Sequence, residues 1–360
     1  MPLPKTMNAM ILTGHGDMDK YEWRRDWPVP EAGKGEVLVR VRACGMNNTD
    51  VNTRAGWYSK AVTGATSETA DEAPDGDDPS WGGKPLAFPR IQGADICGEV
   101  VSVGAGVAPS RIGERIITDC WIRDESNLDD KTQTGYIGSE INGGFAQYCV
   151  LPSRNALKVD SPFTDAELAT FSCSYSTAEG MLSRANVTKA DTVLVPGASG
   201  GVGGALVQLA KRRGARVIAM ASEAKHADVA KLGPDRILTR APKDLRAALG
   251  TEKITVVGDI VGGTYWPTLI DILERGGRYT CSGAIAGPLV DLDLRTLYLR
   301  DLTFTGSTVI DLDVMPNLIR YIETGEVTPA LAASYPLKQL VEAQTAFIRK
   351  EHTGNIVVLP

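Results

Sequence analysis

The sequence predicts an α/β protein in two parts, a β-rich N-terminal domain and a doubly wound parallel sheet. Two observations predict this. Up to about residue 158, short β-branched runs are separated by Gly and Pro clusters, and from Asp165 on, helical segments alternate with short apolar strands. The length of 360 residues, with 43% apolar residues, also exceeds what one hydrophobic core usually organises.

The N-terminal runs predict an all-β domain because their residues alternate or are β-branched. The predicted strands are 8–13, 36–44, 95–104, 114–119 and 145–152. Between the second and third strands lies a polar stretch, 61–83, that contains six acidic residues and no Lys or Arg. Its Gly, Pro, Asp and Glu content predicts a loop.

The second part alternates strand and helix, which predicts a parallel sheet with helices on both faces. The predicted strands are 192–197, 215–221, 254–262, 278–283 and 302–307, and the predicted helices are 165–185, 200–214, 225–233 and 265–277. The tail predicts helices at 312–325 and 338–352 and strands at 333–337 and 355–360. This tail is too short to fold alone, so we expect domains of 1–160 with 310–360, and of 161–309.

Composition excludes several classes of function. A formal net charge of −6 and the lack of a basic stripe argue against a nucleic-acid partner. No apolar run is long enough to span a membrane, and the first residues do not resemble a secretion signal. The six cysteines lie far apart without a CxxC pair, which favours a reducing cytoplasm.

A glycine motif follows the strand 192–197 and opens the helix that begins at 200. In such a turn, Gly200 lets the backbone approach a pyrophosphate, Gly203 lets the helix pack closely, and the helix N-terminus offers N–H donors. This context predicts a dinucleotide site of the Rossmann type, although a tight turn that binds no phosphate is the alternative. The residues of the motif are Ala198, Ser199, Gly200, Gly201, Val202 and Gly203.

The end of the next strand favours NADPH as the cofactor. NAD enzymes place Asp or Glu there, whereas this strand ends at Ser222, and Lys225 lies close enough to reach a 2′-phosphate. A solvated lysine is the alternative interpretation. Two further strands end in turns with Gly262 and with Ser282 and Gly283, which we expect to wall the ribose and nicotinamide.

Several stretches together resemble the medium-chain dehydrogenase/reductase superfamily over nearly the whole chain. They are EVLVRVRACGMNNTD, GADICGEVVSVGAGV, GGFAQYCVLP, the glycine motif and HTGNIVVLP, in that order. The resemblance implies a GroES-like β-rich catalytic domain and a Rossmann nucleotide domain. It also implies a homodimer that pairs through the last strands of the nucleotide sheet, near LRDLTFTGSTVI.

The resemblance breaks at the zinc ligands of the alcohol dehydrogenases in this superfamily. Their first cysteine corresponds to Asn47, their Gly-His-Glu to Gly93-Ala94-Asp95, and only Cys173 keeps a thiol. A stable zinc site needs three protein ligands, so we expect no metal. The alternative is an unusual site built from Cys44, Asp95 and Cys173, although Cys44 fits a core position better. The structural zinc lobe is also missing, since 120–144 holds one cysteine.

The sequence around Asn47 resembles instead the zinc-free quinone oxidoreductase and enoyl reductase branch. There the resemblance implies Asn47 as a hydrogen-bond donor to the substrate carbonyl, Thr49 as a relay hydroxyl and Tyr58 as a phenol at the pocket, with Asp50 as a fourth catalytic candidate. Asn47 and Asp50 could instead cap a short helix, and Tyr58 could be a packed ring.

We therefore predict an NADPH-dependent oxidoreductase that transfers hydride to a quinone, an activated double bond or a carbonyl of a small molecule, without zinc. Two alternatives remain: a zinc-dependent alcohol or aldehyde dehydrogenase, and a protein that binds NADPH without catalysis. The acidic stretch 61–83 is either a lid that repels anionic substrates such as acyl-CoA or a solvated loop without a role. The sequence does not identify the substrate.

Overall fold

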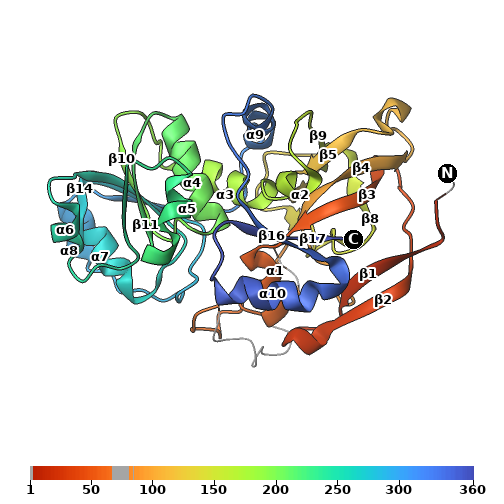
Figure 1. Ribbon diagram of the computed structural model, residues 1–360, viewed down its shortest axis with the longest axis horizontal. Coiled ribbons are helices and arrows are strands. Elements are labelled where there is room, and N and C mark those ends of the chain that lie inside the picture. The colour runs from red at the N-terminus through yellow and green to blue at the C-terminus, as the bar shows by residue number, and fades with distance from the viewer. Residues whose placement is uncertain (1–2, 67–80, 84) are drawn as a thin grey trace.

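The computed structural model describes residues 3–66, 81–83 and 85–360. Two large sheets lie at opposite ends of an elongated molecule, and the chain begins and ends at the β-rich end (Figure 1). The acidic residues of the predicted loop, from Glu68 to Asp78, lie outside the described residues. The predicted α/β class with a β-rich domain and a Rossmann sheet is confirmed.

The Rossmann sheet has six parallel strands in the order β12-β11-β10-β13-β14-β15. Alternate residues of its central strands enter different cores: Val193 and Val195 join one and Leu194 the other, so both faces are covered. The strands are β10 (Thr192–Val195), β11 (Arg216–Ala221), β12 (Arg236–Thr239), β13 (Ile254–Asp259), β14 (Leu273–Cys281) and β15 (Thr303–Gly306). The helices are α3 (Ser172–Arg184), α4 (Gly201–Arg212), α5 (His226–Ala230), α6 (Leu245–Leu249), α7 (Trp266–Asp271) and α8 (Leu294–Leu299).

The β-rich domain is built on a second sheet with the order β16-β17-β3-β4-β5-β9, and β8 also pairs with β3. Its strands are β3 (Glu36–Gly45), β4 (Asp95–Val103), β5 (Arg115–Thr118), β8 (Tyr148–Pro152), β9 (Ala156–Lys158), β16 (Leu331–Pro336) and β17 (Asn355–Leu359). Because β17 pairs with β3, the tail does return to the N-terminal domain. The tail also contributes α9 (Val314–Glu323) and α10 (Leu340–Arg349). The predicted domain boundaries stay a prediction.

Some predicted elements are wrong. The predicted helix 165–185 is split into α2 (Asp165–Leu168) and α3, with a turn at 169–171. The predicted helix 265–277 ends at Asp271, because β14 already begins at Leu273 and the left-handed Gly276 lies within it. The hairpin of β1 (Thr6–Leu12) with β2 (Tyr21–Pro28) was only half predicted, since β2 is mostly polar. A small pair, β6 (Trp121–Arg123) with β7 (Thr134–Tyr136), occupies the place of the missing zinc lobe.

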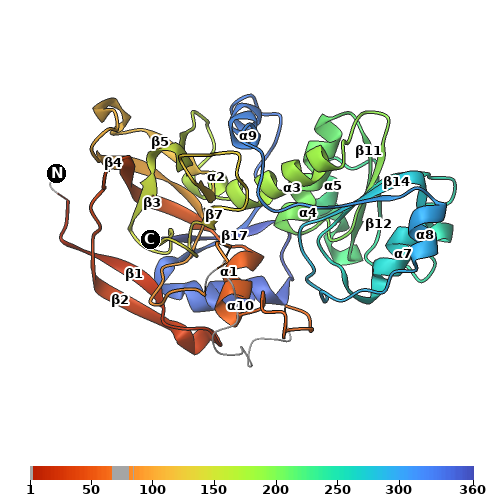
Figure 2. The ribbon, with the colours of Figure 1, turned by 180° about the vertical axis from the view of Figure 1, so that it is seen from behind.

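The site lies where the two domains meet. From behind, β17 of the β-rich sheet runs toward α4 of the Rossmann domain, and α1 (Asn48–Ala55) and α10 lie below it in the view (Figure 2). Gly354, just before β17, donates its N–H to the Ser199 carbonyl of the glycine loop at 2.8 Å. The C-terminal strand is therefore attached to both domains.

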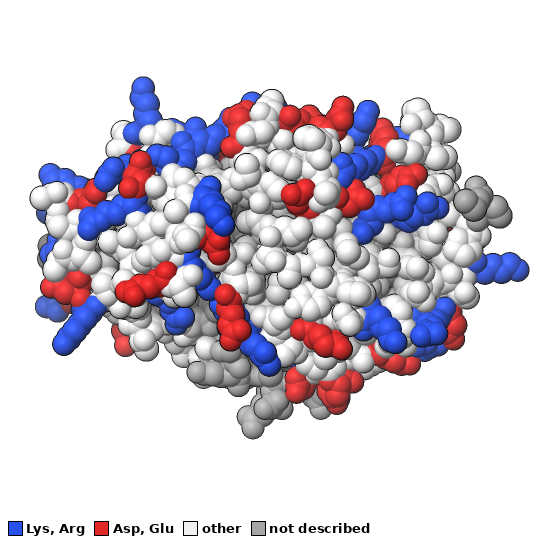
Figure 3. Space-filling model, in the orientation of Figure 1, with Lys and Arg blue, Asp and Glu red and all other residues white. Residues whose placement is uncertain are grey.

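The surface carries charges of both signs. On the face shown in Figure 3, acidic and basic side chains interleave around an uncharged centre. Among the described residues, no helix has the length and apolarity to cross a membrane.

Candidate active site

The glycine loop leaves room for a ligand at one glycine and not at its neighbours. A Cβ on Gly203 would lie 2.2 Å from the Gly197 carbonyl oxygen, so α4 packs directly on the loop. A Cβ on Gly200, the N-cap of α4, would meet only that same oxygen at 3.6 Å. The fold therefore does not require glycine at 200, whereas a phosphate lying against the helix N-terminus would.

The predicted motif residues lie together at this N-terminus. Ala198 and Gly203 are buried, whereas Ser199, Gly200, Gly201 and Val202 are partly exposed. The residues present therefore fit a dinucleotide pyrophosphate, with the exposed backbone of 199–202 as its contact surface.

A cluster of cations lies beyond the end of β11. Ser222 is followed by a short 3₁₀ turn that contains Lys225, whose Nζ donates to the Lys350 carbonyl oxygen from the other domain. The Lys350 Nζ in turn donates to Asn48 Oδ1 at 2.9 Å. Burial and the charge of Lys225 lower the pKa of Lys350 to about 7. Burial and the charge of Arg240 lower the pKa of Lys225.

The loops after β13 and β14 form one wall at the carboxyl edge of the sheet. Gly262 has a φ of 61°, and its Cβ would lie 2.9 Å from the Gly287 carbonyl oxygen. The Ile285 N–H donates to the Ile260 carbonyl oxygen, which brings the loop of Ser282 and Gly283 against that of Gly262. The predicted residues Gly262, Ser282 and Gly283 are thus close together, and the tight packing of the two loops explains in part why residue 262 is a glycine.

Asn47 is held at both its backbone and its side chain. It precedes α1, and its backbone N–H donates to Asp50 Oδ2 at 2.8 Å. Its side-chain Nδ2 donates to Asp95 Oδ2 at 2.7 Å, and its Oδ1 accepts from the Ser174 hydroxyl at 3.3 Å. Asp95 Oδ1 also accepts the Cys173 N–H at 2.5 Å. Burial raises the pKa of Asp50 and of Asp95 to about 7.

The other two catalytic candidates lie in the first turn of α1 and just after its end. Thr49, in the first turn, is partly exposed, and the residues that the structure describes give its hydroxyl no hydrogen-bond partner. Tyr58 follows the helix, and its ring packs against Trp57 and Trp81 with centroids 5.8 and 4.9 Å apart.

The sequence analysis missed an aromatic wall beside this network. Trp81 packs against Trp121 and Tyr136 at centroid distances of 5.3 and 5.7 Å. The Tyr136 hydroxyl is buried and lies near the Cys120 and Cys173 thiols, with no hydrogen bond of good geometry to any described residue. These side chains come from separate loops and strands, so no local motif could have indicated them.

Comparisons with known proteins agree with the geometry. Residues 33–161 match the alcohol dehydrogenase GroES-like domain, and residues 201–324 match the zinc-binding dehydrogenase family. A solved structure from Sinorhizobium meliloti 1021, provisionally described as an alcohol dehydrogenase, is 45% identical with a TM-score of 0.90, covering 99% of this chain and 98% of that one. The chain belongs to the medium-chain dehydrogenase/reductase superfamily.

Curated members of this superfamily match the chain end to end. Acryloyl-coenzyme A reductase of Metallosphaera sedula is 25% identical, covering 98% of this chain and 99% of its own length. Quinone oxidoreductase of Homo sapiens is 23% identical, covering 99% and 98%. The predicted enzyme class, an NAD(P)-dependent oxidoreductase, and the predicted likeness to quinone oxidoreductases and enoyl-type reductases are confirmed. The absence of zinc stays a prediction.

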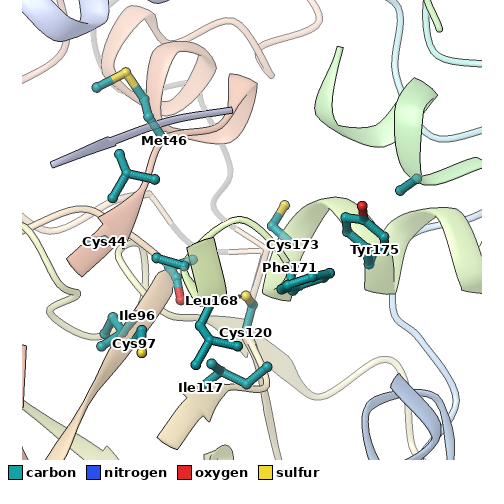
Figure 4. Packing of buried hydrophobic residues seen from close by; sticks show 14 of the residues in the cluster. Cys44, Met46, Ile96, Cys97, Ile117, Cys120, Leu168, Phe171, Cys173 and Tyr175 are labelled. Atoms are coloured by element: carbon teal, nitrogen blue, oxygen red, sulfur yellow. Dashed lines mark hydrogen bonds between the residues drawn. The ribbon is translucent and has the colours of Figure 1, made fainter. Parts of the chain in front are cut away.

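The zinc ligand positions of the superfamily carry a hydrogen-bonded network in this chain. Cys44 lies on β3 with its Sγ against Gly93 and Gly144, whereas Cys173 opens α3 (Figure 4). Within residues 3–66, 81–83 and 85–360, no three His, Cys, Asp or Glu side chains are arranged to hold a metal. The three residues of the alternative site, Cys44, Asp95 and Cys173, are thus not gathered into such a group among the described residues, and the zinc content stays a prediction.

Proposed function

We propose that this protein is an NADPH-dependent reductase that transfers hydride to a quinone, an activated double bond or a carbonyl of a small molecule, without zinc. The observation that carries the proposal is the cation cluster beyond β11. The charge of Arg240 acts on Lys225, and the charge of Lys225 acts on Lys350. None of the three forms a close ion pair with a described residue, although the carboxylate of Glu351 also acts on Lys225.

A 2′-phosphate would supply the missing negative charge. The positive charges of this cluster outnumber its carboxylate, Glu351, and a doubly charged phosphate would remove the remaining repulsion. A ribose with two free hydroxyls offers no such compensation, and the residues at the end of β11, Ala221 and Ser222, carry no carboxylate to bind them. The next residue, Glu223, is exposed and counts slightly against phosphate binding. Lys225 lies on one domain and Lys350 on the other, so the phosphate would also join the domains.

The bound cofactor would supply the hydride from its nicotinamide. The chain then has to hold the acceptor oxygen as negative charge gathers there. Asn47 has a second Nδ2 hydrogen beyond the one that it gives to Asp95, and this hydrogen can donate to the oxygen. Thr49, in the first turn of α1, has a hydroxyl with no hydrogen-bond partner among the described residues, and it can pass a proton between solvent and the acceptor.

The donor set supports chemistry without zinc. Asn47 and Ala94 replace two ligands, and an amide and a methyl group are not zinc ligands. The remaining thiol, Cys173, is one ligand where a stable zinc site needs at least three.

Exposed apolar side chains support a homodimer. Leu289, Leu294, Tyr298 and Leu299 are 70%, 64%, 62% and 56% exposed, next to the edge strand β15. Such a patch beside an unpaired strand edge favours sheet pairing between two copies. All six cysteines are free thiols, which supports the proposed cytoplasmic location.

The test combines fluorescence titration with NADPH and NADH, elemental analysis, and turnover of 1,4-benzoquinone, an enone and an alcohol. Tighter NADPH binding, substoichiometric zinc and NADPH oxidation by the quinone or enone are the expected results. One equivalent of zinc with alcohol turnover would replace the proposal by an alcohol dehydrogenase. Nucleotide binding without turnover of any acceptor would indicate a non-catalytic role.

A further inference from the structure

Asp95 is a carboxylate without a countercharge at the centre of the candidate site. It is 1% exposed, and the described part of the chain gives it no ion pair with Lys, Arg or His. Burial of an unpaired carboxylate is costly, so the groups that it accepts from must compensate. Those groups are the N–H of Cys173, the Nδ2 of Asn47 and, at 3.6 Å, the thiol of Cys120.

The two carboxylate oxygens serve different purposes. Oδ1 accepts the Cys173 N–H in the first turn of α3, where the helix has unpaired donors, so this contact caps the helix. Oδ2 accepts only from Asn47. The contact with Cys173 accounts for an acidic residue at this position through helix capping alone. The contact with Asn47 acts on a side chain that is only 7% exposed and that precedes α1.

The contact with Asp95 favours one orientation of the Asn47 amide. The Nδ2 atom lies 2.7 Å from Asp95 Oδ2, an acceptor, and the Oδ1 atom lies 3.3 Å from the Ser174 hydroxyl, whose single hydrogen is shared with Asn355 Oδ1 at 3.2 Å. Turning the amide over would place its oxygen against the carboxylate. The backbone is fixed as well, because the Asn47 N–H donates to Asp50. One Nδ2 hydrogen is used, and the other stays available in a fixed direction.

We infer that Asp95 is a positioning residue, which holds the carboxamide of Asn47 so that its second N–H donates to the oxygen of the hydride acceptor. The inference rests on the proposed function. In the zinc enzymes of the superfamily a metal would occupy this region, whereas here a carboxylate and an amide define the direction of the donor. An amide that rotates freely would lose this preorganisation.

The exchange of the two side chains separates positioning from folding. In the variant Asn47→Asp with Asp95→Asn, residue 95 can still accept from Cys173 N–H and can donate to residue 47. Both hydrogen bonds of Asp95 are thus preserved, but residue 47 has no N–H left for the substrate. Asp95→Asn alone leaves one amide oxygen for two donors, and Asn47→Ala removes the donor itself. Asp191→Asn serves as the control, because Asp191 is also buried but is paired with Arg278 in the Rossmann domain.

The readouts are kcat and KM with a quinone, the Kd of NADPH, and Tm. We expect Asp95→Asn to lower kcat by about 10- to 100-fold with an NADPH Kd within about twofold of the wild type. The exchange variant should recover the Tm of the wild type while its kcat stays as low as that of Asn47→Ala. Asp191→Asn should lower Tm and leave kcat unchanged.

Two results would overturn the inference, and they differ from failure of the proposed function. If Asn47→Ala loses kcat but Asp95→Asn keeps it, Asp95 does not position the donor. If the exchange variant has the kcat of the wild type, hydride transfer does not need a side-chain N–H of residue 47 that points to the acceptor oxygen. If Asn47→Ala itself keeps kcat, the proposed role of Asn47 fails first.

Discussion

The roles of Lys225 and Lys350 are tested most directly by comparing the binding of NADPH with the binding of NADH. Lys225→Met and Lys350→Met remove a charge and keep an apolar stem of similar length. A charge-assisted hydrogen bond is worth about 1.5–3 kcal/mol, and solvent screening where these side chains are partly exposed lowers this to about 1–2 kcal/mol. Each substitution should therefore weaken NADPH binding by about 5- to 30-fold and leave NADH binding within about twofold.

The same cluster predicts a dependence on pH. The pKa of Lys350 is lowered to about 7, so the side chain is charged below pH 7 and loses its proton as pH rises. NADPH affinity should fall between pH 7 and 8.5, where the 2′-phosphate is already fully ionised. The pKa of His352 is lowered to about 4 by burial and the charges of Lys350 and Lys225, so this imidazole is neutral throughout that range. Lys350→Met should remove the pH dependence.

The assay is a titration of nicotinamide fluorescence at constant ionic strength. Lys231→Met is the matched control, because Lys231 lies just after α5, is 76% exposed and pairs only with Asp228. Equal losses of NADPH and NADH affinity in the Lys225 and Lys350 variants would refute a contact with the 2′-phosphate. A wild type without preference for NADPH would refute the cofactor assignment itself.

Three further predictions follow from single contacts. Tyr136→Phe should leave the free energy of unfolding in urea unchanged or raise it, because the Tyr136 hydroxyl lacks a good partner. Tyr175→Phe should lower the free energy of unfolding by about 1–2 kcal/mol, because the Tyr175 hydroxyl donates to the Thr328 carbonyl oxygen and accepts from Gln208. Gly203→Ala, whose Cβ would lie 2.2 Å from a carbonyl oxygen, should weaken binding of both nucleotides at least about tenfold, and unchanged titrations would contradict the packing argument. Leu294→Glu should convert a dimer to a monomer in light scattering, and a dimer that persists would place the interface elsewhere.

Local patterns predicted much of the architecture. The strands of the Rossmann sheet and the glycine loop depend on residues close in sequence. Hydrophobic periodicity and the glycine motif were therefore sufficient to predict them. The strand β2 was missed because its residues alternate poorly, with no buried position among its eight. The early end of α7 depends on pairing of β14 with β13, a contact that no local pattern contains.

The candidate site was predictable only where a family motif covers it. Asn47 was found through its motif, but its partners Asp95 and Ser174 lie 48 and 127 positions away in the chain. Lys350 was missed for the same reason, since it meets Lys225 across 125 positions. Buried polar contacts between distant segments depend on the packing of whole domains, and sequence periodicity does not report that packing.

The place of β17 in the sheet bears on how the chain folds during synthesis. This strand lies between β16 and β3, yet it is synthesised after both of them. Until β17 has left the ribosome, one edge of β3 lacks its β17 partner, and the glycine loop lacks the contact from Gly354 to Ser199. A nascent chain that lacks β17 would thus expose an apolar strand edge that invites aggregation, and a bound cofactor would be held by the complete glycine loop only once β17 is in place.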